Sequence, residues 1–186
     1  MESIRSGYFK FELNNGDIVM ITLNFGALYR LRNTDKQLYD EYNGILRKKD
    51  SDKDEIDSAR LIYVAYRCAN EAEHMSFEEF IELMPYNRKY IQRIIQDLYY
   101  TSKKKGDFED VFRAAAERIN VRNRGINIPD FELVEIEEFY TYYVQIMNIP
   151  DEMFWNADIK FLDKVVNQKA AYDKWLSKAM QKESER

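Results

Sequence analysis

The stretch "YFKFELNNGDIVMITLNFGALYRL", residues 8–31, contains the change of hydrophobic period that decides the fold. Its first six residues alternate between apolar and polar side chains, "NNGD" (14–17) has the composition of a turn, and "IVMITL" (18–23) is rich in β-branched residues. From Phe25 onward the apolar residues recur at helical spacing instead. The sequence therefore predicts an N-terminal β-hairpin followed by helices.

The helical pattern continues beyond this stretch with a break near Thr34. The segment "TDKQ" (34–37) has the Thr-x-x-Gln form of a capping box, which predicts that one helix ends and another begins there. A further apolar stripe predicts a helix over about residues 55–73. The single cysteine, Cys68, lies on that stripe, so we expect a packed thiol.

The stretch "SFEEFIELM" (76–84) has the form of a helix start. Ser76 is the expected N-cap, Glu79 completes a capping box, and Pro85 ends the helix. Apolar residues at helical spacing predict the next helix, and they are Ile91, Ile94, Ile95 and Leu98.

A change of composition after residue 102 predicts a boundary. Residues 103–129 carry 7 basic and 4 acidic side chains, contain "KKKGD" and "RGINIP", and hold an amphipathic stretch, "FEDVFRAAAERI". Two helical stripes follow, with Pro150 and "FWNAD" between them and Asn156 as a candidate cap for the last helix. They predict a C-terminal helical hairpin.

These patterns predict a mainly α protein with a short N-terminal β-hairpin. Residues 1–102 form the hairpin and a small helical domain, 103–129 a basic linker with an amphipathic helix, and 130–186 a C-terminal helical extension. No apolar run approaches the roughly 20 residues needed to cross a bilayer, and "MESIRSG" lacks the apolar core of a secretory signal. We therefore expect a cytoplasmic protein without membrane contact.

Two acidic stretches, residues 49–57 and 74–84, each resemble part of a calcium-binding EF-hand, but the ligand spacing does not fit. Asp50, Asp52 and Asp54 match the first ligand positions of an EF-hand loop, but the required glycine and the bidentate glutamate fall on Glu55 and Leu61. Counting back from Glu79 fails in the same way. We therefore expect no metal site and read residues 50–57 as a loop between helices.

Catalytic patterns are not found either. The sequence has no Gly-rich phosphate loop, nucleophile elbow, HExxH or CxxC motif, and it contains one histidine. We expect no enzyme and no cofactor, although one sequence leaves open a cleft with converging carboxylates. The basic linker leaves a small regulatory nucleic-acid-binding protein as an alternative, and the net charge of −5 of the whole chain argues against it.

Three stretches resemble tail assembly chaperones of long-tailed bacteriophages and prophages. "FELNNGDIVMITLNFGALYRL" and "SFEEFIELMP" resemble the N-terminal part of these proteins, and "MFWNADIKFLDKVVNQKAAYDKW" resembles their C-terminal extension. The resemblance implies the extended form of the chaperone, which is commonly made by ribosomal frameshifting, or a relative of that form encoded in one reading frame. In the family, such proteins bind the tape measure protein, keep it soluble and recruit tail-tube (major tail) subunits, without catalysis and without remaining in the finished tail.

That role requires exposed apolar surface for a helical client. The candidate partner contacts are Phe139, Tyr143, Trp155 and Trp175. Packing is the competing interpretation for each of them, because a small helical hairpin needs its aromatic side chains inside. Coating a long client would favour a homo-oligomer, but no heptad repeat predicts its size.

Overall fold

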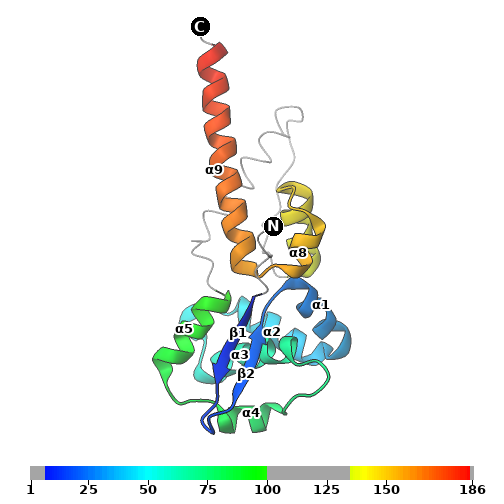
Figure 1. Ribbon diagram of the computed structural model, residues 1–186, viewed down its shortest axis with the longest axis vertical. Helices are drawn as coiled ribbons and strands as arrows, with labels where there is room; N and C mark the ends of the chain where they lie inside the picture. Colours follow the sequence, from blue (N-terminus) through cyan, green and yellow to red (C-terminus); the bar gives the residue numbers. More distant parts are fainter. Residues whose placement is uncertain (1–6, 100–134, 185–186) are drawn as a thin grey trace.

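The computed structural model describes residues 7–99 and 135–184 (Figure 1). These residues form a mainly α protein with one two-stranded antiparallel hairpin at the N-terminal end, so the predicted fold class is confirmed. The predicted boundaries at residues 102 and 129, and the predicted linker helix, lie outside the described residues.

The hairpin consists of β1 (Tyr8–Glu12) and β2 (Ile18–Thr22). The turn closes with a hydrogen bond from the Leu13 N–H to the Asp17 carbonyl, and Gly16 occupies a positive φ of 85° that side chains other than glycine rarely adopt. Alternation turns one face toward the core, where Phe11 and Ile21 are inaccessible to solvent and Phe9 and Val19 are half-buried.

A single non-helical residue separates α1 (Phe25–Thr34) from α2 (Lys36–Arg47). The break near Thr34 is confirmed, but the predicted capping box is wrong. The Asp35 carboxylate accepts from the Leu38 N–H and caps α2, whereas the Thr34 hydroxyl donates back to the Arg30 carbonyl at 3.0 Å. Thr34 is still helical, so its side chain cannot serve the following helix.

Helix α3 (Glu55–Ala69) follows a short 3₁₀ turn, η1 (Asp50–Asp52), and packs against β2. Its start is fixed by a capping box between Asp54 and Asp57. The helix ends at Ala69, earlier than the predicted residue 73, because the backbone of the next residue, Asn70, leaves the helical region with φ −130° and ψ 67°.

Helices α4 (Phe77–Leu83) and α5 (Arg88–Tyr99) close the core beside the hairpin (Figure 1). The predicted capping box of α4 is confirmed: Ser76 Oγ accepts from the Glu79 N–H, and the Glu79 carboxylate accepts from the Ser76 N–H at 2.8 Å. The Ser76 hydroxyl also donates to the Glu79 carboxylate at 3.0 Å, and the two bonds that this carboxylate accepts from Ser76 lower the pKa of Glu79.

The C-terminal region contains one more helix than predicted. Its elements are α7 (Ile136–Tyr140), continued by the π-helical stretch η2 (Thr141–Ile146), then α8 (Asp151–Asn156) and α9 (Ile159–Ser184). Pro150 followed by two acidic residues favours a helix start, which explains α8. Asn156 is not the cap of α9, because the Asp158 carboxylate accepts from the Phe161 N–H at 2.7 Å.

A cluster of packed aromatic rings joins the C-terminal region to α1. We call it the aromatic seam, and its central members are Phe25, Phe139, Tyr143 and Phe154. The Phe25 ring stacks on Phe154 with centroids 4.5 Å apart and also contacts Phe139 and Tyr143. The backbone approaches closely here, since a Cβ on Gly26 would lie 2.7 Å from the Trp155 carbonyl oxygen. The C-terminal helices therefore share one hydrophobic core with the hairpin and α1–α5.

Candidate partner-binding surface

Helix α9 is anchored at its N-terminal end and extends away from the other labelled helices (Figure 1). Leu162 and Val166 are buried in the shared core, and Lys160 forms an ion pair with Asp97 of α5 at 3.3 Å. The Tyr143 hydroxyl donates to the buried carboxylate of Asp163. Packing, an ion pair and a buried hydrogen bond therefore fix the direction of α9.

Beyond this anchor the helix exposes large apolar side chains. Tyr172, Trp175 and Met180 are 58%, 62% and 61% exposed, and the rings of Tyr172 and Trp175 lie 5.9 Å apart. Helical spacing places them on one side of α9 together with two smaller apolar residues. We call this set the α9 stripe, and its members are Tyr172, Trp175, Leu176, Ala179 and Met180.

The four aromatic residues suggested by the sequence lie in two different environments. Tyr143 is 1% exposed, and Phe139 is half-buried against Phe25 and Tyr143, so both contribute to the seam. Trp155 is half-buried at the edge of the seam. Trp175 is the member of the four whose side chain is mostly free to contact another molecule.

Trp155 lies at the solvent-facing edge of the aromatic seam. Its ring meets Tyr29 of α1 edge to face at 5.7 Å and lies 5.8 Å from the ring of Tyr140. Its indole N–H donates to the Asp151 carboxylate at 3.2 Å, which holds the ring in place. Trp155 is thus positioned by three neighbours and presents only part of its surface.

The sequence interpretation missed Tyr172 and Met180 as contact residues. The sequence shows Phe161, Val165 and Tyr172 at helical spacing on one face of α9, but Phe161 and Val165 pack against the core whereas Tyr172 is exposed. A stripe of uniform character gives no sign of where packing ends and exposure begins. One feature of the sequence could have indicated the exposed half: lysines recur at every fourth position from Lys174 to Lys182, and such a run is typical of a helix in contact with solvent.

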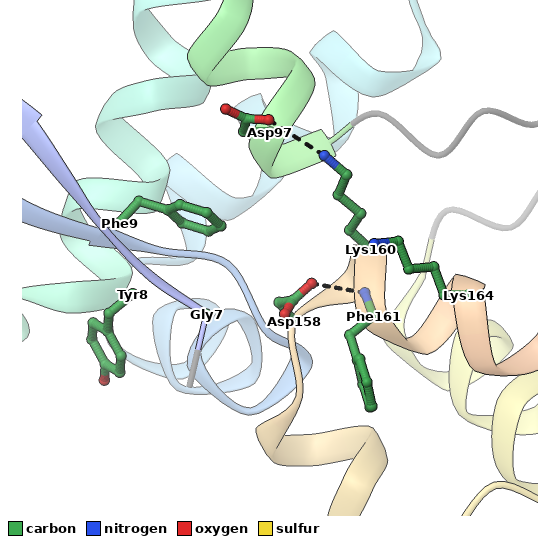
Figure 2. A pocket seen from close by; sticks show the side chains of 8 residues that line it. All are labelled: Gly7, Tyr8, Phe9, Asp97, Asp158, Lys160, Phe161 and Lys164. Carbon is green, nitrogen blue, oxygen red and sulfur yellow. Dashed lines mark hydrogen bonds and ion pairs between the residues drawn. The ribbon is translucent and has the colours of Figure 1, made fainter. Parts of the chain in front are cut away.

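A cavity of about 440 Å³ lies between the start of β1, the end of α5 and the start of α9 (Figure 2). Two of its charges, Asp97 and Lys160, pair with each other, and the Asp158 carboxylate caps α9. Lys164 lies at the rim on the next turn of α9. The side chains of Asp97, Lys160 and Asp158 are thus occupied by structural contacts, and the two carboxylates do not form a converging pair for acid/base chemistry.

The acidic fragments that suggested calcium have structural partners. Asp54 caps α3, and the Asp57 carboxylate accepts from the Lys48 ammonium at 2.7 and 2.9 Å. The hydrogen bond from Lys48, and after it the one that the Asp54 N–H donates to the same carboxylate at 3.1 Å, lower the pKa of Asp57. Among the residues that the structure describes, no cluster of three or more His, Cys, Asp and Glu side chains is arranged to hold a metal ion.

Cys68 is buried on α3, as its position on the apolar stripe predicts. Burial raises the pKa of its thiol to about 12, so the thiolate that would react is strongly disfavoured.

Within residues 7–99 and 135–184, no helix has the length and apolar character needed to cross a membrane. Comparison of the chain with protein-family models, with curated proteins and with solved structures found no match.

Proposed function

We propose that the protein is a non-catalytic assembly factor, a tail assembly chaperone of a long-tailed phage or prophage. In this role it binds the long helical tape measure protein, keeps it soluble and recruits tail-tube subunits. The observation that supports the proposal most directly is the α9 stripe, an exposed aromatic surface on a helix held rigidly at one end.

The physical requirements of such a role agree with this arrangement. A long amphipathic client has to bury its apolar face temporarily, and an aromatic stripe on another helix offers a sequence-tolerant surface for it. Anchoring α9 in the core reduces the entropy lost on binding, because the helix is already formed.

Co-expression provides the test. The full chain is produced together with the tape measure protein encoded near its gene, and the soluble fraction and co-purification of the long protein are measured. We expect the chain to raise the soluble fraction severalfold, and the double variant Tyr172→Ala/Trp175→Ala to lose most of that effect.

The matched control is Tyr86→Ala, which removes another exposed aromatic side chain, 92% exposed and remote in sequence from α9. We expect it to behave like the unchanged chain. Failure of the unchanged chain to co-purify with the long protein contradicts the chaperone role. Salt-sensitive binding to DNA or RNA at micromolar protein would instead support a nucleic-acid-binding function.

A further inference from the structure

We propose that Asn15 is a site of spontaneous deamidation, at which the backbone nitrogen of Gly16 attacks the side-chain amide and water completes the conversion to aspartate or isoaspartate. The inference goes beyond the proposed function and does not depend on it. It rests on the two places in the sequence where glycine follows asparagine, Asn15-Gly16 and Asn43-Gly44, because the fold puts these pairs in opposite environments.

The reaction is least hindered where glycine follows asparagine, because glycine has no side chain to obstruct its own backbone nitrogen. That nitrogen loses its proton and forms a bond to Cγ of the asparagine. The bond from Cγ to Nδ2 breaks, and Nδ2 takes up a proton and leaves as ammonia, so that a cyclic succinimide remains. Water then adds to either carbonyl carbon of the succinimide and opens the ring, to aspartate or to isoaspartate, without any change of oxidation state.

Asn15 lies in the exposed loop of the hairpin. Gly16 has a φ of 85° and its N–H donates to the Leu13 carbonyl at 2.9 Å, a loop geometry with glycine in the left-handed position. Oδ1 of Asn15 accepts from the Asp17 N–H at 3.0 Å, and Nδ2 donates to the Asp17 carboxylate at 2.7 Å. The bond to Oδ1 draws electron density from Cγ and stabilises the negative charge that develops on this oxygen during the attack.

One hydrogen bond in the loop opposes the reaction. The Gly16 nitrogen can attack only after its N–H has left the Leu13 carbonyl, so the loop has to open locally. Residues 14–17 are all exposed and lie at the tip of a two-stranded hairpin, where such opening costs little free energy. We therefore expect Asn15 to react in the folded chain, although more slowly than in the unfolded chain.

Asn43 is protected although the same residue follows it. It is 3% exposed and lies within α2, and its Nδ2 donates to the Glu135 carboxylate at 3.5 Å. Ring closure would require the backbone of Asn43 to leave its helical conformation, so α2 would first have to unfold. A Cβ on either glycine would meet no other described part of the chain within 4 Å, so the environment of the asparagine distinguishes the two sites.

The two products change the loop differently. Aspartate at position 15 places a second carboxylate beside Asp17, where Nδ2 of Asn15 now donates at 2.7 Å. Isoaspartate also inserts a methylene into the main chain, because the backbone then runs through the former side chain. The hydrogen bond from the Leu13 N–H to the Asp17 carbonyl, which helps to fix the register of the two strands, no longer fits the longer loop.

Peptide mapping of the full chain by mass spectrometry tests the proposal. The chain is incubated in mildly alkaline buffer, folded or in guanidinium chloride, and the converted fraction at each asparagine is followed by its mass increase of about 1 Da. In the folded chain we expect Asn15 to react about tenfold or more faster than Asn43, because an exposed loop opens more often than a packed helix. In guanidinium chloride the two rates should agree within about threefold.

Asn14 is the internal control, because it is exposed in the same loop but is followed by asparagine. It should stay largely unmodified in the folded chain. Asn15→Gln should abolish the modification at position 15, since its longer side chain closes a larger ring much more slowly. The isoaspartyl form, separated by chromatography, should unfold at a lower urea midpoint than Asn15→Asp.

Three results overturn the proposal. Equal rates at Asn15 and Asn43 in the folded chain would show that the fold does not select the site. A difference between them that persists in guanidinium chloride would assign the selection to the neighbouring sequence instead. Conversion of Asn14 as fast as Asn15 would show that exposure alone decides, without attack by the Gly16 nitrogen.

Discussion

Replacing Phe154 by alanine is the sharpest test of the shared core. The side chain is inaccessible to solvent and contacts four aromatic rings, among them Phe25 of α1 at 4.5 Å and Tyr140 edge to face at 5.2 Å. It is the point at which the C-terminal region is held against the N-terminal helices. Its removal leaves a cavity between two segments that are far apart in the sequence.

Truncation of a buried phenylalanine to alanine typically costs about 3–5 kcal/mol, the sum of lost transfer free energy and the cavity that remains. With a urea m-value of about 2 kcal/mol per molar, which is typical of small proteins, that loss lowers the unfolding midpoint by about 1.5–2.5 M. Aromatic contacts beyond simple burial favour the upper part of this range.

Two optical probes separate the regions of the chain. Both tryptophans lie in the C-terminal region, so tryptophan fluorescence follows that region, whereas far-UV circular dichroism follows helices throughout the chain. Because the core is shared, we expect the two probes to give coincident urea transitions for the unchanged chain. In Phe154→Ala both transitions should shift together.

Tyr172→Ala serves as the control, since an exposed side chain of similar size outside the core should change stability by no more than about 0.5 kcal/mol. The reasoning is refuted if Phe154→Ala shifts the fluorescence transition while circular dichroism keeps its original midpoint. That result would mean that the C-terminal helices unfold independently.

Four other predictions follow from local contacts. Gly26→Ala brings a Cβ to 2.7 Å from a backbone carbonyl and should destabilise the chain by about 1–3 kcal/mol in urea unfolding. Ser76→Ala removes the cap of α4 and should cost about 1 kcal/mol in the same assay, whereas Ser76→Asp should restore most of it. The pKa of Asp57 is lowered in the folded state, first by its hydrogen bond from Lys48. Its ionised carboxylate therefore stabilises the fold fully above the unfolded pKa of about 4, and this contribution is lost as the pH falls through the folded pKa. When urea midpoints are measured at several pH values, the midpoint of Asp57→Asn should fall less on acidification than that of the unchanged chain. The Cys68 thiol should resist a thiol reagent in the native protein and react at once in urea, which absorbance of the released chromophore would record.

The sequence predicted those features that depend on nearby residues. The hairpin turn at Gly16 and the capping box of Ser76 and Glu79 are local, and the structure confirms both. The two caps predicted wrongly lay within one or two residues of the true ones, Asp35 and Asp158, because neighbouring polar residues compete and the backbone at the break decides between them.

The environment of the aromatic residues depends on contacts that no local pattern encodes. Tyr143 is buried because Phe25, more than a hundred positions earlier in the chain, packs beside it. Trp175 belongs to a similar apolar stripe and is exposed because α9 continues past the end of the core. Periodicity identified the faces of these helices, and only the tertiary arrangement distinguished the packed face from the exposed one.

The residues that stabilise the fold at the aromatic seam are different from the residues of the α9 stripe that are proposed to bind a partner. Seam residues such as Phe154 contact α1, whereas the α9 stripe lies beyond the last core residue of the helix, so changes at the two places should have independent effects. Phe154→Ala should lower the urea midpoint and, at temperatures where the chain is still folded, leave the soluble fraction of the co-expressed tape measure protein within about twofold of its value with the unchanged chain. Trp175→Ala should do the reverse. A Phe154→Ala protein that is folded by circular dichroism but loses most of its effect on the soluble fraction of the tape measure protein would show that the orientation of α9, and not only its exposed side chains, determines binding.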